Sequence, residues 1–186
     1  MFAYISYGYP RFYFDWTYLL VIAGVILSMM ASARVKSAFA KYSRISTIQG
    51  VTGAQAAQQI LNQAGIYDVQ IRHISGNLND HYDPRNKTLS LSDRVYGSAS
   101  VAAVSVAAHE CGHAIQHARG YTPLKIRSSL VPVANFGSAI SWPLIVIGLL
   151  MGYHSPLITI GIILFSSVVL FHLVTLPVEF NASARG

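Results

Sequence analysis

Fifty-one consecutive residues, 128–178, contain no charged side chain. A membrane-spanning helix needs about 20 apolar residues, so this stretch is too long for one span and suits two. Gly152 and Pro156 border a polar break, which predicts a turn between helices over 131–151 and 157–178. A second uncharged run, 16–33, predicts another span over 16–34. The sequence therefore favours three transmembrane helices, of which the last two form a hairpin.

Composition supports a membrane protein. Charged residues make up 11% of the chain and hydrophobic residues 53%, whereas soluble domains carry about 25% charged residues. This excludes a disordered chain and disfavours a soluble globule. The single cysteine, Cys111, excludes a disulfide framework, and we assign it no chemistry. Residues 31–33 fit a signal-peptide cleavage site, but the apolar run before them is long and the positive charge follows it, which favours a retained span.

The positions of the basic residues predict the orientation. Eleven of the 13 lysines and arginines lie between Arg34 and Arg127. The positive-inside rule places this segment in the cytoplasm, and three spans return the C-terminal segment to the same side. Basic residues directly after the first span predict contact with anionic lipid rather than with nucleic acid. We therefore divide the chain into an N-terminal segment with the first span (1–34), a cytoplasmic domain (35–127) and a helical hairpin (128–186).

The cytoplasmic segment predicts a small α+β domain. Thr52 and Gln55 form a capping box at the start of a helix that ends near Gly65. Alternating apolar residues predict a strand over 67–74, and Thr88–Leu91 predicts a second strand that could be an exposed edge for substrate. An Ala- and Val-rich helix is expected over 98–118. The predicted fold class is a mainly α integral membrane protein with three transmembrane helices and this cytoplasmic domain.

The last of these helices contains the sequence His-Glu-Cys-Gly-His at 109–113, an H-E-x-x-H pattern. Histidines four residues apart lie on one helical face, so His109 and His113 can bind one zinc ion. Glu110 stands beside the first ligand, where its carboxylate can take a proton from a zinc-activated water and pass it to the leaving amine. A buried polar pair on a core helix is the alternative, but unpaired burial of these groups would be costly.

A catalytic zinc ion usually has three protein ligands. His117 follows His113 by one turn, but it lies two turns, about 12 Å, from His109, so the three imidazoles cannot converge. The chain has only two glutamates, and the second, Glu179, follows the third predicted span on the cytoplasmic side. We expect Glu179 to complete a His-His-Glu site. A solvated helix end is its alternative role.

Three segments of the chain resemble the bacterial YugP-type membrane zinc metallopeptidases. They are His109–Gln116, Asp80–Arg85 and Leu176–Ser183, and they occur in the family's order. The resemblance covers nearly the whole chain. It implies a zincin-like neutral metallopeptidase domain anchored in the cell membrane.

The resemblance also implies site residues. The family's zinc-binding histidines fall on His109 and His113 and its catalytic glutamate on Glu110, and the resemblance supports Glu179 as third ligand. A wider similarity is to the gluzincin membrane proteases of the HtpX type. Those proteins have an acidic residue where this chain has Ser183. We therefore expect the hydrogen bonds that orient the ligands to come from elsewhere.

Several polar residues are expected around the site rather than on the metal. Asn181 and Asp93 are candidates for orienting the ligands. His81 is expected either to line the cleft or to stabilise its turn. The residues expected to line the cleft or to support the ligands are His117, His81, Tyr82 and Asn181.

The sequence thus predicts a zinc-dependent endopeptidase that cleaves protein or peptide substrates at the cytoplasmic face of the bacterial cell membrane, as a multi-pass protein. A non-catalytic zinc scaffold or adaptor is one alternative, but structural zinc sites usually have four protein ligands. An intramembrane protease is another, but the uncharged stretch before Glu110 has only 15 residues, which is short for a span. The bilayer is an expected partner and nucleic acid is not; a homo-oligomer or a regulatory membrane partner is left open.

Overall fold

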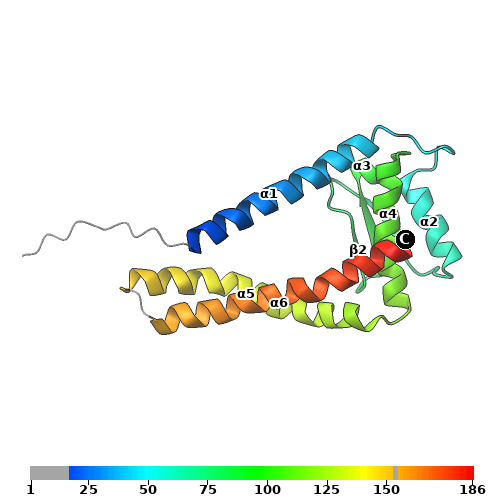
Figure 1. Cartoon of the computed structure of the whole chain (residues 1–186). Helices are drawn as coiled ribbons and strands as arrows, with labels where there is room; N and C mark the ends of the chain where they lie inside the picture. Colours follow the sequence, from blue (N-terminus) through cyan, green and yellow to red (C-terminus); the bar gives the residue numbers. More distant parts are fainter. Residues whose placement is uncertain (1–16, 153–154) are drawn as a thin grey trace, which may run out of the picture. The chain divides into compact units, whose positions relative to one another are not determined.

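The computed structural model describes residues 17–152 and 155–186. Its elements follow the chain in the order drawn in Figure 1. They are α1 (Thr17–Tyr42), α2 (Gly53–Gln63), β1 (Gln70–Ile74), β2 (His81–Asp83), β3 (Thr88–Ser92), α3 (Asp93–Tyr96), α4 (Val101–Ala118), α5 (Thr122–Leu150) and α6 (Ser155–Arg185). The chain forms two compact units, Met1–Tyr42 and Ser43–Gly186. The second unit holds both the small sheet and the α5–α6 hairpin.

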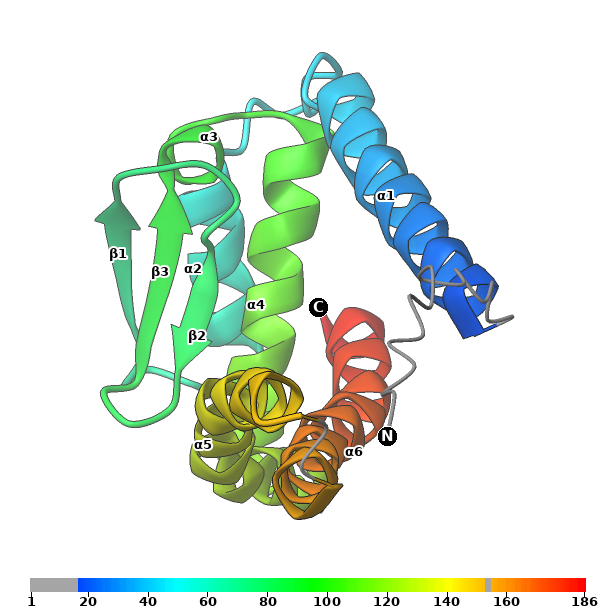
Figure 2. The same ribbon diagram turned by 90° about the vertical axis from the view of Figure 1, so that its left-hand side faces the viewer.

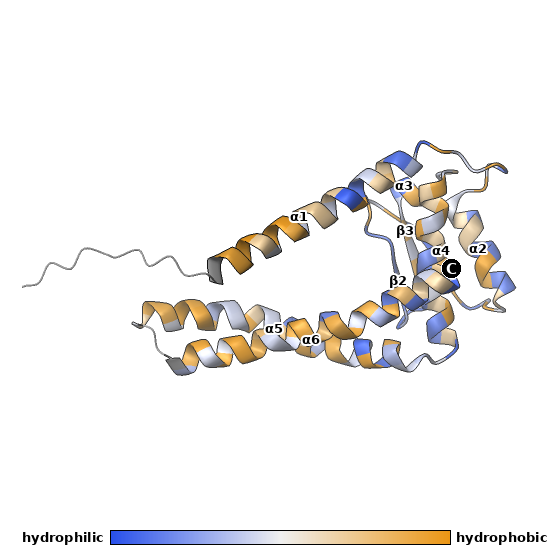
Figure 3. Ribbon diagram, in the orientation of Figure 1, coloured by the Kyte–Doolittle hydropathy of each residue, from blue (hydrophilic) through white to orange (hydrophobic). Residues whose placement is uncertain are grey.

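Three of the described helices are long and apolar enough to cross a membrane. They comprise Leu19–Tyr42, Thr122–Leu150 and Pro156–Arg185. Figure 3 shows the apolar residues concentrated in α1 and in the parts of α5 and α6 nearest their connecting turn. The predicted spans 131–151 and 157–178 lie within these helices or within one residue of their ends, and the described part of the predicted span 16–34 lies in α1 (Thr17–Tyr42); residue 16 lies outside the described residues. The helices are longer than the runs because the helical backbone continues into polar turns, as at the carboxyl end of α1.

The hairpin is packed through small residues. A Cβ atom at Gly137 of α5 would meet Ser167 and the Leu164 carbonyl of α6, and one at Gly161 would meet Ile145. Close approach through glycine is a common way for helices in membranes to pack, because lipid gives them little hydrophobic drive to associate. Prolines lie inside both helices without ending them. The predicted turn is confirmed at Gly152, whose φ of 73° is a conformation that glycine adopts readily.

The sheet has three strands in the order β1-β3-β2. β1 runs parallel and β2 antiparallel to β3. The expectation that Thr88–Leu91 is an edge is wrong, because β3 is the central strand and is buried along its whole length. The exposed edge next to α4 is instead β2, a three-residue strand within a stretch that the sequence indicates only as turns. Figure 2 shows the sheet, with α2 behind it, lying alongside α4.

Local signals explain the helices of this layer. The capping box at α2 is confirmed, since the Thr52 hydroxyl accepts from the Gln55 amide and the Gln55 side chain accepts from the Thr52 amide. Ser100 caps α4 by accepting from the amide of Ala103. Apolar side chains from α2, β3, α3 and α4 form the core, of which the fully buried members include Leu61, Leu89, Leu91, Val95 and Cys111. This core fixes α4 against the sheet and leaves its other face for α6.

Candidate metal centre

Helix α4 presents both histidines of the motif on its α6-facing side. His109 is partly exposed and His113 has only 8% of its surface accessible. Their rings meet edge to face with centroids 4.9 Å apart. Because the surrounding helix is rich in alanine, no bulky side chain separates the two imidazoles.

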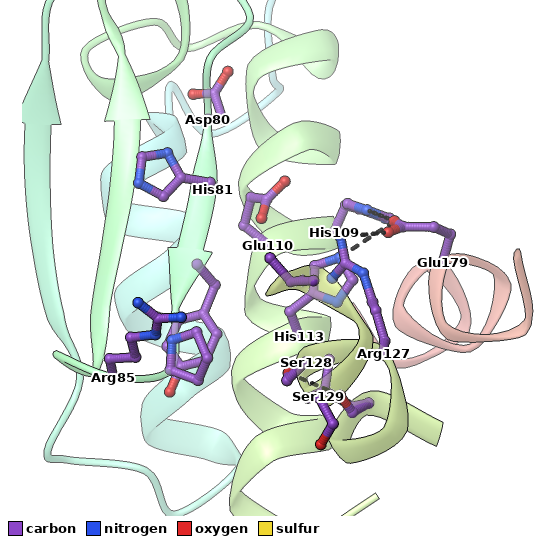
Figure 4. A pocket seen from close by; sticks show the side chains of 14 residues that line it. Asp80, His81, Arg85, His109, Glu110, His113, Arg127, Ser128, Ser129 and Glu179 are labelled. Carbon is purple, nitrogen blue, oxygen red and sulfur yellow. Dashed lines mark hydrogen bonds and ion pairs between the residues drawn. The ribbon is translucent and has the colours of Figure 1, made fainter. Parts of the chain in front are cut away.

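Glu179 of α6 reaches both imidazoles with one oxygen. Its Oε2 lies 3.1 Å from Nε2 of His109 and 3.3 Å from Nε2 of His113. The ligand atoms of the three residues all lie within 4.8 Å of one another. Two imidazole nitrogens and a carboxylate oxygen turned toward one point are a donor set that suits zinc. Figure 4 shows Glu179 entering from α6 toward the two histidines.

A glycine in the motif permits this convergence. A Cβ atom at Gly112 would overlap the carbonyl oxygen of Ala182 in α6. The backbones of α4 and α6 therefore touch at this point, within one turn of each candidate ligand. In the pattern H-E-x-x-H the position of Gly112 is variable, but this packing requires its small size.

Gln116 orients His113. This glutamine is fully buried, and its Oε1 lies 3.1 Å from Nδ1 of His113. Its amide nitrogen donates to the Val178 carbonyl at 2.8 Å and to the Asn181 side chain at 3.0 Å. An Nδ1–H bond to Gln116 leaves the Nε2 lone pair of His113 facing Glu179, as a metal ligand requires. No periodicity or spacing in the sequence predicts this role.

Ser183 performs the corresponding task for His109. Its Oγ lies 2.9 Å from Nδ1 of His109. The expectation that this hydrogen bond comes from elsewhere is wrong: a serine hydroxyl reaches the imidazole where the HtpX-type proteins have an acidic residue. Asp93 is remote from the metal group, since it binds the His73 imidazole and the Gly76 amide. Asn181 acts one step further out, through Gln116.

Arg127 contacts the other oxygen of Glu179. Its Nη2 is 3.4 Å from Oε1, so the two carboxylate oxygens have different partners. Its Nε is buried and has no hydrogen-bond partner. In the sequence Arg127 stands out only as the last charge before the uncharged run. No periodicity or motif indicates that it turns back to the site.

Glu110 lies on α4 beside the metal group and lines the same pocket. Burial raises the pKa of its carboxyl, and the neighbouring imidazoles oppose that rise. The pKa of His109 is raised chiefly by its hydrogen bond to Glu179. The pocket has a volume of about 520 Å³ and is bordered by β2, α4, α5 and α6. Glu110 therefore faces a space large enough for a peptide segment.

Of the other predicted residues, His81 and Tyr82 line this pocket, whereas His117 does not. His81 lines it and also bonds the Asn79 carbonyl at 2.9 Å, so it combines both of its expected positions. The Tyr82 hydroxyl bonds Nδ1 of His117 at 2.9 Å. Burial raises the pKa of Tyr82 to about 12. His117 thus has a partner other than Glu179 and lies outside the group of ligand atoms, on the side of α4 that faces the sheet.

Comparisons with known proteins show the family of the chain. Residues 17–186 match the family described as "putative neutral zinc metallopeptidase". The chain is also 48% identical over 166 residues to the Bacillus subtilis (strain 168) protein named "Putative membrane protease YugP", over 89% of this chain and 73% of that relative. No solved structure matches the chain. Since the family match spans nearly all of the sequence, including the His-His-Glu group, the chain belongs to this neutral zinc metallopeptidase family.

Proposed function

We propose that the chain is a zinc-dependent, membrane-anchored endopeptidase. The observation that carries this proposal is the convergence of His109, His113 and Glu179 within 4.8 Å, on the border of a pocket that Glu110 also lines. Three protein ligands are typical of catalytic zinc sites, which keep one position open. Zinc would there lower the pKa of a water molecule and polarise the substrate carbonyl.

The role assigned to Glu110 is that of general base and then general acid. Its carboxylate would accept a proton from the attacking water and return it to the nitrogen of the leaving amine. Its neighbour His109 is a proposed ligand, and the Glu110 side chain itself lines the pocket (Figure 4). Arg127 would keep Oε1 of Glu179 occupied, so that Oε2 faces the imidazoles.

The outer edge of β2 is the proposed docking strand for the substrate. β2 pairs with β3 on one side only, and Asp80, His81 and Tyr82 line the pocket. An extended peptide can add to such an edge through main-chain hydrogen bonds and leave its side chains to select the sequence. This explains how a peptidase can act on many peptides that share only their backbone.

The membrane part of the proposal rests on helix length and charge. The chain has three helices long and apolar enough to span a bilayer. Eleven of the 13 basic residues lie between the first and second of the predicted spans, which favours a cytoplasmic position for the metal site. The proposed location is therefore the bacterial cell membrane, with several spans and with the site at the cytoplasmic face.

Two alternatives fit less well. A structural zinc site would need a fourth protein ligand, whereas the metal group found among the described residues has three members and borders an open pocket. An intramembrane protease would bury α4 in lipid, but α4 is not among the described helices that are long and apolar enough to span. Both observations favour hydrolysis at the membrane surface.

The test is hydrolysis by the full chain in detergent. Zinc-loaded wild type should cleave casein or members of a peptide library, lose this activity to a chelator and regain it with zinc. Glu110→Gln should keep its zinc and lose at least about 100-fold in kcat. Ser105→Ala, at an exposed position of the same helix, is the matched control and should retain cleavage. Equal cleavage by Glu110→Gln would disprove the base assignment, and zinc-loaded wild type that cleaves nothing would favour the scaffold.

A further inference from the structure

A second pocket adjoins the one at the metal centre. It has a volume of about 350 Å³. The two pockets share four lining residues, namely Pro84, Arg85, Leu124 and Ser128. The second pocket continues past them toward the carboxyl end of α4 and the first turns of α5. A peptide that lies in the first pocket can therefore place a neighbouring side chain in the second.

Two unpaired cations border this second pocket. Arg85 and Lys125 both line it, and both side chains are exposed. Within residues 17–152 and 155–186 neither forms an ion pair, whereas Lys87 pairs with Asp68 and Arg127 with Glu179. The Asp83 carboxylate accepts from the backbone amide of Arg85 but is not part of the lining. Because two cations and no acidic residue of the described chain line the pocket, it presents a net positive charge to whatever enters it.

The rest of the lining is partly apolar. Pro84 and Tyr121 form walls, and Leu124 is 6% exposed at the base. Apolar walls suit the methylene groups of a short side chain, and cations suit a carboxylate at its end. Glutamate and aspartate side chains have this combination.

The direction of β2 gives the position of the acidic residue. Asp80 precedes β2 and Arg85 follows it, so the two lie at opposite ends of the strand with the metal group between them (Figure 4). Antiparallel pairing is slightly more stable per residue than parallel pairing, so we take the substrate to pair antiparallel to β2. It then runs from the Arg85 end toward the Asp80 end. The part of the substrate on the amino-terminal side of the cleaved bond then lies near Arg85 and Lys125.

We propose that this second pocket is a specificity site that selects an acidic side chain within three residues on the amino-terminal side of the cleaved bond. The inference rests on the proposed peptidase function and adds the substrate class to it. An anionic lipid headgroup is the other ligand with suitable charge. The residues shared with the metal-site pocket favour the peptide, because a peptide can occupy both pockets at once, whereas a headgroup needs only the second pocket.

Cleavage of matched peptides tests the proposal. The full chain in zwitterionic detergent would be given internally quenched peptides that carry Glu, Gln or Lys at these positions, and its kcat/KM for each peptide would be compared. We expect kcat/KM for Glu to exceed that for Lys by about tenfold, the size of a favourable charge contact. The double variant Arg85→Glu/Lys125→Glu should reverse the order. Arg72→Glu, on β1 at the far edge of the sheet, is the matched control and should leave the order unchanged.

Peptide binding gives a second readout that does not need hydrolysis. The inactive Glu110→Gln variant should bind fluorescent Glu peptides more tightly than it binds Lys peptides. Adding Arg85→Glu and Lys125→Glu to this variant should remove the difference. Absence of any cleavage by wild type with this binding preference intact would refute the peptidase function and leave the pocket assignment standing. Equal handling of Glu and Lys peptides, or a preference that charge reversal does not change, would overturn the assignment. So would a preference that disappears in nanodiscs of anionic lipid but persists in neutral ones, because the headgroup would then be the occupant.

Discussion

Gly112 of α4 lies directly against the carbonyl of Ala182 in α6, so that the two backbones touch without an intervening side chain. These are the helices that carry the candidate ligands, two on α4 and one on α6. The separation of the helices at this point therefore sets whether the carboxylate reaches the imidazoles.

Replacing Gly112 with alanine should separate the helices. The new methyl group would overlap backbone atoms, which cannot rotate away, so we expect a loss of about 1–3 kcal/mol in stability and weaker zinc binding. Thermal unfolding in detergent and zinc titration would measure both. Gly97→Ala is the control, because a Cβ atom there meets no atom within 4 Å. Normal zinc affinity in Gly112→Ala would show that the close approach is dispensable.

Zinc stoichiometry distinguishes the proposed ligands from their neighbour. His109→Ala, His113→Ala and Glu179→Ala each remove a donor atom and should weaken zinc binding by on the order of 100-fold or more, because even supporting residues are worth 10–100-fold. His117→Ala should bind zinc like wild type, since its imidazole bonds Tyr82. Metal analysis after dialysis against a graded series of chelator concentrations would measure this. Full zinc content in Glu179→Ala would exclude the carboxylate as a ligand.

Gln116 should matter for zinc although it is no ligand. Gln116→Met keeps the length of the side chain but removes the acceptor for His113, so we expect zinc affinity to fall about 10–100-fold. Asn181→Ala removes only one of the two groups that accept from the Gln116 amide, and its loss should be smaller. Zinc titration of both variants would give the order. A larger loss in Asn181→Ala than in Gln116→Met would contradict this role.

Deprotonation of Tyr82 should lower the free energy of unfolding in strong alkali. Burial, followed by the charges of Asp68 and Asp83, raises the pKa of its phenol to about 12 in the folded chain, from about 10 in an unfolded chain. The unfolded chain therefore loses this proton first, and stability is full below pH 10 and declines as the pH rises toward 12. Thermal unfolding of wild type and Tyr82→Phe across this range would show a smaller decline in the variant. Parallel declines would place the phenol in contact with water.

Cysteine labelling tests on which side of the membrane the metal site lies, and the native cysteine should contribute little signal. Cys111 is the only cysteine, and burial raises its pKa to about 12, so it should react poorly. Ile48, before α2, and Met151, at the turn of the hairpin, are both exposed. In spheroplasts a membrane-impermeant maleimide should label Met151→Cys, and it should label Ile48→Cys only after permeabilisation. The reverse pattern would place the metal site outside the cell.

Much of the local structure could be predicted because the signals are local. The capping box of α2, the glycine turn of the hairpin and the helix that carries the motif all depend on residues close in sequence. β2 was missed because three residues among turn formers give no periodicity, and the strand exists only through its pairing with β3. The order of the strands likewise depends on contacts that no pattern within one strand records.

In the candidate site, too, the residues with a local sequence signal could be predicted and those placed by helix packing could not. The spacing of His109 and His113 follows from helix geometry, and the scarcity of glutamate pointed to Glu179. Gln116, Ser183 and Arg127 could not be assigned, because their roles depend on how α4, α5 and α6 pack. Ser183 is the one residue with a sequence clue, but a serine where HtpX-type proteins have an acidic residue predicts a lost hydrogen bond, whereas the hydroxyl in fact bonds His109.

The candidate ligands are separated by 70 residues along the chain. A ribosome therefore completes both imidazoles before the carboxylate, and the intervening residues include α5 and most of α6, which are long and apolar enough to span a bilayer. If the chain is a peptidase, a nascent or prematurely released copy is inert toward other proteins in the cell. Hydrolysis then becomes possible only after α6 has been synthesised and has packed against α4.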